Sequence, residues 1–260
     1  TWEAFPVKAG DRLSFGYLKS GARASIAISG GVDVPVKLGS RSTYTLGALG
    51  GRMKSRQLWV VRHAQPLVAP GICYGALDVT ADPAATAECA RRLAVVLPHG
   101  LWVRHSPLQR CEQLAQSLQA LRPDLASEAD GRLVEMDFGT WEGRAWTDIA
   151  RADIEAWTAR FADHCPGGGE SLASMLRRVA HALQEARETA HRQKGDVLWI
   201  SHAGVARCVQ WLHDGRAANG VPPQADQWPL EAPAPGYWAC FPLGQRRPRS
   251  AAGSLEAQCR

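Results

Sequence analysis

Residues 58–63 read LWVVRH, an apolar run that ends in a guanidinium and an imidazole. A short apolar run of this kind is typical of a buried strand in a parallel sheet. Open α/β folds bind ligands at the carboxyl ends of such strands, which is where Arg62 and His63 would lie. Arginine matches phosphate oxygens bidentately, and a neutral imidazole is a competent nucleophile. The stretch therefore indicates phosphoryl chemistry on histidine, although a second pair, Arg104-His105, shows that the dipeptide alone is weak evidence.

The chain from Met53 onward has the pattern of an α/β sheet, because apolar runs alternate with stretches of helical character. Strands are predicted over 57–62, 100–104, 131–136, 196–201 and 236–241, and helices over 83–97, 107–121, 145–161, 171–193 and 203–213. Pro83 suits a first helical turn, and Gly195 marks the stop before the fourth strand. Residues 219–235 hold five of the sixteen prolines, and we expect an irregular loop that makes a surface excursion, with a loop that overhangs the site as the alternative.

Composition excludes several classes of protein. The net charge of +5 comes mostly from residues 1–52, which carry +4, so no basic face for nucleic acid is predicted. No run approaches the roughly 18 apolar residues of a membrane span. The seven cysteines form no CxxC pair, which favours the reducing cytoplasm. The chain begins with Thr1 and shows no leader, and we expect its true start to be missing.

Residues 1–52 read differently, with short β-type runs separated by glycines. Residues 26–44 read IAISGGVDVPVKLGSRSTY and continue as TLGALGG. This segment resembles the biotin-dependent carboxyltransferase-like family, which includes subunits of allophanate hydrolase and of 5-oxoprolinase, but it covers only a small part of that family's length. We therefore expect residues 1–52 to be a truncated, β-rich and non-functional fragment, residues 53–245 a second domain, and residues 246–260 a disordered tail.

Residues 106–110 read SPLQR and follow a predicted strand directly. Pro107 can begin a helix, which places Arg110 in its first turn. There the guanidinium and the free backbone N–H groups would both face an anion. The alternative is an ordinary solvated arginine on a helix.

Residues 135–143 read EMDFGTWEG, a strand end followed by a carboxylate and a glycine-punctuated aromatic loop. A carboxyl group held near these apolar side chains could protonate a leaving oxygen. Chemistry alone does not separate Glu135, Asp137 and Glu142 for this role, and Glu135 as a surface strand residue is the alternative.

Residues 199–205 read WISHAGV, again an apolar strand that ends in a histidine. His202 lies beside His63 if the two strands are neighbours, and its protonated form would donate N–H groups to a transferring phosphoryl group. A packed strand-end histidine is the alternative. Residues 166–171, PGGGES, are expected to cap the long helix that follows.

These elements, in this order, resemble the histidine phosphatase superfamily with its phosphoglycerate-mutase-like fold, over roughly residues 56–245. The resemblance implies a three-layer α/β sandwich with a mostly parallel central sheet, preceded here by the short β-rich appendage. Carried over by motif, it implies His63 as the phosphorylated nucleophile, Glu135 as the proton donor, His202 as the second catalytic histidine, and Arg62 and Arg110 as phosphate ligands. Arg104-His105 precedes the SPLQR element and is not the catalytic pair.

The chain departs from the family pattern directly after the nucleophile. The usual Arg-His-Gly is Arg-His-Ala here, and Gln65-Pro66 stands where Glu or Gln with Thr is common. These changes remove no catalytic group but put in doubt how this loop shapes the leaving-group side. Gln65 and Ala203 complete the candidate substrate- or phosphate-binding residues.

The function implied by the resemblance is a phosphomonoesterase that needs neither metal nor cofactor, because two arginines and an imidazolium supply the positive charge. Residues 71–78, GICYGALD, look most like the α-ribazole phosphatase group of cobalamin biosynthesis. The expected partner is a small phosphorylated metabolite, without nucleic acid or membrane, acted on by a monomer or homodimer. The alternatives are a phosphoglycerate mutase-type phosphotransferase, disfavoured by the few extra basic residues in the motif loops, and a non-catalytic carboxyltransferase-like fusion or interaction protein.

Overall fold

The structure is a computed structural model that describes residues 56–214 and 223–244. The strands are β1 (Gln57–Arg62), β2 (Trp102–His105), β3 (Ser127–Ala129), β4 (Val197–Ser201) and β5 (Trp238–Pro242). The α-helices are α1 (Pro83–Val96), α2 (Gln109–Leu121), α3 (Arg151–Ala159), α4 (Leu172–Gln193) and α5 (Ala203–His213). The predicted fragment 1–52, the predicted tail 246–260 and part of the proline-rich segment lie outside the described residues.

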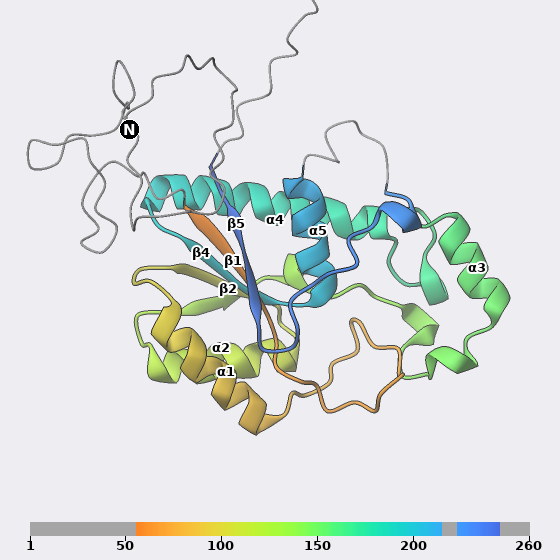
Figure 1. The fold of residues 1–260 in the computed structure, drawn as a ribbon, viewed down its shortest axis with the longest axis horizontal. Coiled ribbons are helices and arrows are strands. Elements are labelled where there is room, and N and C mark those ends of the chain that lie inside the picture. Colours follow the sequence, from red (N-terminus) through yellow and green to blue (C-terminus); the bar gives the residue numbers. More distant parts are fainter. Residues whose placement is uncertain (1–55, 215–222, 245–260) are drawn as a thin grey trace, which may run out of the picture. The chain divides into compact units, whose positions relative to one another are not determined.

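The five strands form one sheet in the order β3-β2-β4-β1-β5. All neighbours pair in parallel except β5, which runs antiparallel to β1. Helices α4 and α5 cover one face of the sheet and α1 and α2 cover the other, so that the fold has three layers (Figure 1). The prediction of an α/β sandwich with a mostly parallel sheet is confirmed.

The central strand β4 shows why both faces need helices. All five of its residues are buried. Val197 and Trp199 pack in the core beneath α4 and α5, whereas Leu198 and Ile200 pack in the core beneath α1 and α2. Successive side chains of a strand point to opposite faces, so a strand that is buried at every position needs helices over both faces of the sheet.

The prediction of a strand over residues 131–136 is wrong. Residues Gly131–Leu133 form a 3-10 turn, and the strand at this edge of the sheet is the preceding β3. Leu133 is fully buried in the core beneath α4. The guanidinium of Arg178 donates to the backbone carbonyls of Arg132, Val134 and Glu135, so this segment satisfies its carbonyls without a neighbouring strand.

The helix predicted over residues 145–161 is interrupted. Trp146–Asp148 forms a 3-10 turn, Ile149 and Ala150 are extended, and α3 begins only at Arg151. The side chain of Ile149 is buried in a small core with Cys73 and Trp141, which accounts for the break in the helix. No helix of the described residues is long and apolar enough to cross a membrane.

The register of the sheet brings three polar side chains together. Arg62 of β1 lies opposite Ser201 of β4, so the next residues, His63 and His202, leave the sheet side by side. The backbone N–H of His63 donates to the carbonyl of Ser201 at 3.0 Å. On the other side of β4, the backbone N–H of Ser106 donates to the carbonyl of Ile200 at 2.9 Å. Neighbouring parallel strands therefore deliver Ser106, His202 and His63 to one edge of the sheet.

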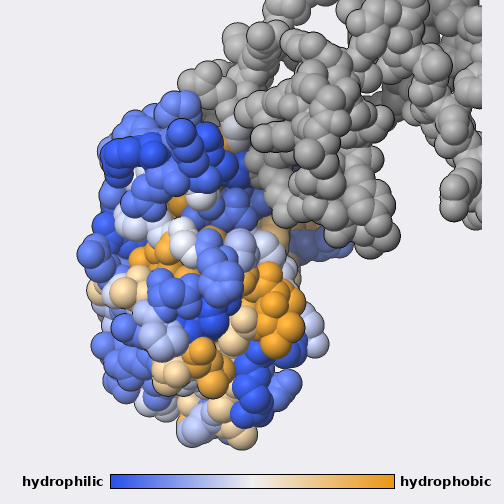
Figure 2. Space-filling model, turned by 90° about the vertical axis from the view of Figure 1, so that its left-hand side faces the viewer, coloured by the Kyte–Doolittle hydropathy of each residue, from blue (hydrophilic) through white to orange (hydrophobic). Residues whose placement is uncertain are grey.

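The face of the domain on the left-hand side of Figure 1 is mostly polar. Figure 2 views the molecule from that side, and hydrophilic residues predominate there. The hydrophobic residues of this face lie in separate areas among hydrophilic ones.

Candidate active site

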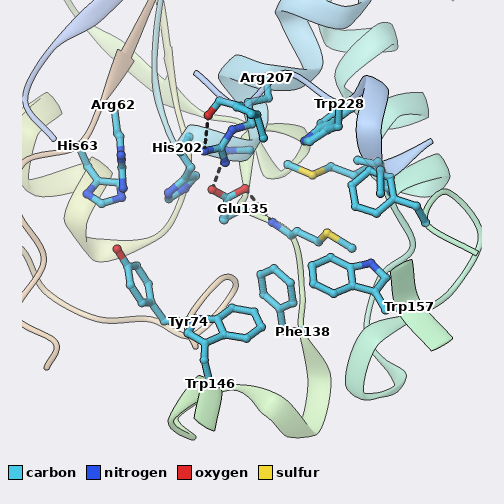
Figure 3. Close-up of a pocket in the computed structure, with 18 of the residues that line it drawn as sticks. Arg62, His63, Tyr74, Glu135, Phe138, Trp146, Trp157, His202, Arg207 and Trp228 are labelled. Carbon is cyan, nitrogen blue, oxygen red and sulfur yellow. Dashed lines mark hydrogen bonds between the residues drawn. The ribbon is translucent and has the colours of Figure 1, made fainter. Parts of the chain in front are cut away.

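A cavity of about 530 Å³ lies at the carboxyl ends of β1 and β4. One end is polar and the other is apolar and aromatic (Figure 3). The polar end is lined by Arg62, His63, Arg110, Glu135 and His202. All five are residues for which the sequence predicted a catalytic or phosphate-binding role, and the fold brings them together from positions up to 140 apart in the chain.

His63 is 2% exposed, and its Nδ1 lies 2.7 Å from the carbonyl oxygen of Ala64. A carbonyl only accepts, so Nδ1 carries the proton and Nε2 has a free lone pair. Burial, with the cations Arg110 and then Arg62 nearby, lowers the pKa of His63 to about 3, although the Ala64 hydrogen bond opposes this shift. The imidazole is therefore neutral at physiological pH, as a nucleophile must be.

His202 precedes α5 as its N-cap residue, and its ring centroid lies 5.2 Å from that of His63. Its Nε2 lies 2.8 Å from the hydroxyl oxygen of Ser106. Burial lowers the pKa of His202 well below its ordinary value, and His63, Arg110, Arg178 and Arg62 add to the shift. Burial therefore favours the neutral form of His202 in the ligand-free site, whereas its protonation beside a bound phosphoryl group stays a prediction.

The two arginines approach the histidines from different elements. Arg110, in the first turn of α2, is fully buried and donates to the carbonyls of Leu77 and Gly75 at 2.8 and 2.5 Å. This contradicts the alternative of a solvated helix arginine. Arg62 donates to the carbonyl of Pro233 at 3.2 Å. In both side chains the Nε is buried without a hydrogen-bond partner among the described residues.

Unpaired donors concentrate around this cavity. Six buried side-chain nitrogens lack a partner in the described part of the chain, and four of them belong to lining residues: Arg62 Nε, Arg110 Nε, Trp157 Nε1 and His202 Nδ1. Unpaired buried donors are costly, and an anion with several acceptor oxygens relieves that cost. The three donors at the polar end, on Arg62, Arg110 and His202, suit a phosphoryl group, whereas Trp157 lies at the aromatic end (Figure 3).

Glu135 is the carboxylate of the EMDFGTWEG stretch that lines the cavity. Its carboxylate oxygens accept from the backbone N–H of Gly204 at 2.9 Å and from that of Met136 at 3.1 Å. Asp137 is exposed and accepts from a neighbouring glycine, while Glu142 accepts from the backbone N–H groups of residues 76, 77 and 138. Of the three carboxylates that residue chemistry alone left open, only Glu135 lines the cavity.

Of the remaining predicted residues, one lines the cavity and the others do not. Ala203 lines the cavity as the first residue of α5. Gln65 is exposed and is not among the lining residues, so its role as a ligand stays a prediction. Arg104-His105 also lies outside the lining, and Arg104 forms an ion pair with Glu128.

The glycine-rich loop has a structural role. Ser171 caps α4 by accepting from the backbone N–H of Ser174 at 3.2 Å, as predicted. Glu170 instead pairs with Arg178, the residue that holds the backbone of Glu135. The loop thus supports Glu135 through Arg178 without lining the cavity.

Sequence reasoning missed several lining residues. Arg207 lies just above Glu135 in Figure 3 and donates to the carbonyl of Leu230 at 3.2 Å. Its position one turn after Ala203 on a predicted helix was the signal available. Trp228 and Leu230 also line the cavity, so this part of the proline-rich segment overhangs the site rather than making the expected surface excursion. Within the described residues, no three His, Cys, Asp or Glu side chains cluster as metal ligands would.

Comparison with known proteins identifies the family. The family model of the histidine phosphatase superfamily (branch 1) matches residues 58–222. The chain therefore belongs to the histidine phosphatase superfamily. The adenosylcobalamin/α-ribazole phosphatase of Escherichia coli (strain K12) is 30% identical over 73% of this chain and 91% of that protein.

Solved structures share the fold. The protein TTHB049 from Thermus thermophilus has 27% identity and a TM-score of 0.52, covering 71% of this chain and 92% of that one. A mycobacterial glucosyl-3-phosphoglycerate phosphatase has 24% identity and a TM-score of 0.54, over 71% and 89% of the two chains.

The amino-terminal segment matches a different family. A model of the carboxyltransferase domain, subdomains A and B, matches residues 1–84 and overlaps the phosphatase match from residue 58 onward. Urea amidolyase of Saccharomyces cerevisiae is 60% identical over 45 residues, which are 17% of this chain. The chain spans only 2% of the length of that relative. The predicted resemblance is confirmed, whereas the boundary at residue 53 stays a prediction.

Proposed function

We propose that this phosphatase cleaves small phosphate monoesters through a phosphohistidine on His63, without a metal. The observation that carries the proposal is the pair of neutral imidazoles, 5.2 Å apart, set among unpaired guanidinium donors. The Nε2 lone pair of His63 attacks phosphorus, and the bond from phosphorus to the ester oxygen breaks. The guanidinium groups of Arg62 and Arg110 and the N–H of His202 stabilise the charge on the other phosphoryl oxygens.

Glu135 handles the proton in both steps. In the first step it donates a proton to the leaving alkoxide. In the second it accepts a proton from the water that attacks the phosphohistidine, which releases inorganic phosphate and restores the free imidazole. Its two backbone hydrogen bonds fix the carboxyl group at the cavity wall for both transfers.

Activity of the full chain on p-nitrophenyl phosphate tests this proposal. We expect turnover in the presence of EDTA and an acid-labile phosphorylated enzyme after rapid quenching. His63→Ala should lower kcat by about 10⁴-fold or more and abolish the phosphorylated species. The exposed histidine of α4, in His181→Ala, provides the control and should leave both unchanged. Loss of activity with EDTA would contradict the metal-free mechanism.

For the substrate we propose a monoester whose alcohol carries an aromatic group, with α-ribazole 5′-phosphate as the candidate. Support comes from the apolar end of the cavity, which is lined by Tyr74, Phe138, Trp146, Trp157, Phe161 and Trp228. Aromatic side chains bind planar apolar groups by stacking and edge contacts. The name of the Escherichia coli relative points the same way.

A screen of phosphate release compares the candidates. We expect α-ribazole 5′-phosphate to exceed 3-phosphoglycerate, sugar phosphates and nucleotides in kcat/KM. The alternative of a mutase gains one observation, because Arg207 is a third arginine that lines the cavity. Transfer of phosphate between positions of phosphoglycerate, without net release, would favour that alternative.

We propose that residues 1–52 are a non-functional fragment and that the phosphatase begins at Met53. The two family matches begin at residues 1 and 58, which supports a change of family along the chain, although they overlap over residues 58–84. A chain shortened to begin at Met53 should keep the activity of the full chain. A loss of turnover on shortening would support the other reading, in which the amino-terminal segment serves the function.

We propose a cytoplasmic monomer or homodimer that binds neither nucleic acid nor membrane. All six cysteines of the described residues are free, which supports a reducing compartment. Light scattering of the full chain measures the oligomeric state, and a larger assembly would contradict the proposal.

A further inference from the structure

Ser106 contacts the candidate catalytic histidine without lining the cavity. Its hydroxyl oxygen lies 2.8 Å from Nε2 of His202, and the two residues are 0% and 1% exposed. Both follow directly on neighbouring parallel strands, β2 and β4. The contact is therefore fixed by the register of the sheet.

The neighbouring groups indicate which atom donates in this contact. The thiol of Cys111 lies 3.6 Å from Nε2 of His202 and 3.5 Å from the carbonyl oxygen of Ser201. Burial raises the pKa of this thiol, so it keeps its proton and can donate to that carbonyl. The Ser106 oxygen already lies 3.4 Å from the backbone N–H of Leu108. The Ser106 hydroxyl also contacts the Cys111 thiol, but a protonated thiol is a weak acceptor, so Nε2 of His202 is the better acceptor for the hydroxyl proton of Ser106.

We propose that Ser106 is a positioning residue that donates its hydroxyl proton to Nε2 of His202, so that the neutral imidazole presents an N–H from Nδ1 to the phosphoryl group. Nδ1 is buried and has no partner among the described residues. A neutral imidazole has one N–H donor and one acceptor nitrogen, so the bond at Nε2 sets the character of Nδ1. His202 then supplies a donor without first being protonated.

The charges around His202 disfavour its protonated form, so the tautomer of the neutral ring decides whether Nδ1 carries a proton. The titratable and charged groups that surround it are Arg62 at the end of β1, His63 directly after it, Arg110 and Cys111 of α2, Arg178 of α4, and Glu135. The cations among them oppose an imidazolium in the empty site. Without Ser106, the ring would present its N–H from Nδ1 only in one of two neutral tautomers or when protonated.

Nitrogen-15 NMR of the full chain, labelled at histidine and free of ligand, tests the tautomer directly. We expect neutral His202 with its proton on Nδ1 at neutral pH. A proton on Nε2 alone, or an imidazolium, would overturn the proposal. The measurement needs no turnover and no variant, so its result stands even where a variant fails to fold.

Kinetics test the consequence, which rests on the proposed function. Ser106→Ala should lower kcat on p-nitrophenyl phosphate by about 10–100-fold, with KM changed much less, because one donor to the developing charge is misplaced part of the time. The deficit should shrink as pH falls, because a protonated ring carries an N–H on both nitrogens. Ser106→Thr keeps the hydroxyl and should restore most of the rate.

Ser201→Ala is the matched control. Ser201 is equally buried and adjacent to His202, but its hydroxyl donates to the carbonyl of Leu133 at 2.8 Å. Its loss should cost stability without a pH-dependent deficit. A deficit in Ser106→Ala that stays constant with pH would overturn the proposal. Absence of a phosphorylated His63 in the wild-type chain would instead contradict the proposed function and leave the NMR result to decide the tautomer.

Discussion

Burial gives His63 and His202 a property that exposed histidines lack, because both imidazoles resist protonation in the folded chain. The pKa of His63 is lowered to about 3, so its ring stays neutral until the pH falls close to that value. In the unfolded chain the same rings protonate with a pKa near 6.5. The two residues for which we propose a role in catalysis therefore also make the stability of the chain depend on pH.

We expect the free energy of unfolding to fall as the pH is lowered from about 6.5 towards about 3. Across this window His63 and His202 bind protons in the unfolded state but not in the folded state. A lower pH therefore favours unfolding. The slope contributed is at most about 1.4 kcal/mol per pH unit for each histidine. Urea unfolding at several pH values measures it.

The double variant His63→Gln/His202→Gln should show a shallower dependence on pH. His181→Gln, at an exposed position of α4, should keep the wild-type slope. An unchanged slope in the double variant would show that other groups cause the acid destabilisation.

The sequence was most informative about individual residues of the candidate site. The motifs named His63, Arg110 and His202, and the structure places all three at one cavity. The lowered pKa of His202 was not predictable, because it depends on burial and on Arg178, which lies on a different helix. Arg207 was missed because no motif of the sequence marked it.

At the scale of elements, the start of α5 and the segment that carries Glu135 fit closely together. The backbone N–H of Gly204, in the first turn of the helix, donates to the Glu135 carboxylate. A Cβ on Gly204 would overlap the other carboxylate oxygen. The absence of a side chain at Gly204 thus permits this contact.

Gly204→Ala should lower kcat about 10–100-fold, because the displaced carboxyl group no longer reaches the leaving oxygen. Stability should change little, since alanine favours a helix by up to about 1 kcal/mol over glycine and offsets part of the strain. Kinetics and thermal unfolding of the variant check both. Gly131→Ala, where a Cβ would meet open space, should leave kcat unchanged. An equal kcat in both variants would argue against Glu135 as the proton donor.

The elements that were predicted well have strong patterns of their own. β1 and β4 are apolar runs, and α4 has a cap and an apolar stripe. β3 was missed because its three residues are polar or small and two are exposed. The strand expected at 131–136 has apolar residues, but the side chain of Arg178 donates hydrogen bonds to its backbone carbonyls, which therefore do not pair with a neighbouring strand. Such a tertiary contact is invisible in the local sequence.

At the scale of the whole molecule, the cavity joins segments that lie far apart in the chain. Its polar end is built from the ends of β1 and β4, the first turn of α2 and the segment of Glu135, each of which carries a recognisable motif. Its aromatic end comes from Trp157 of α3 and from Phe138, Trp146 and Trp228 in loops and short turns, and the positions of all four depend on the complete fold. The sequence therefore predicted the chemistry of the site but not the shape that selects a substrate.

The aromatic end should determine which esters bind well. Trp146 lies parallel to Trp157, with ring centroids 6.5 Å apart, and edge-on to Phe138 at 5.6 Å, yet it remains 38% exposed. Its indole is thus available to a ligand without being essential to the core. We expect Trp146→Ala to raise KM for naphthyl phosphate about 3–10-fold, which corresponds to the loss of one aromatic contact.

The same variant should leave KM for glycerol phosphate nearly unchanged, because a small polar alcohol gains little from an indole. Trp102→Ala is the matched control, since Trp102 is partly buried on β2 and lies outside the cavity lining. It should change neither KM. Equal losses with both esters in Trp146→Ala would mean that the aromatic end supports the fold of the site rather than the choice of leaving group. A loss confined to the aromatic ester would show that the cavity, and not the phosphoryl chemistry, sets the specificity of this enzyme.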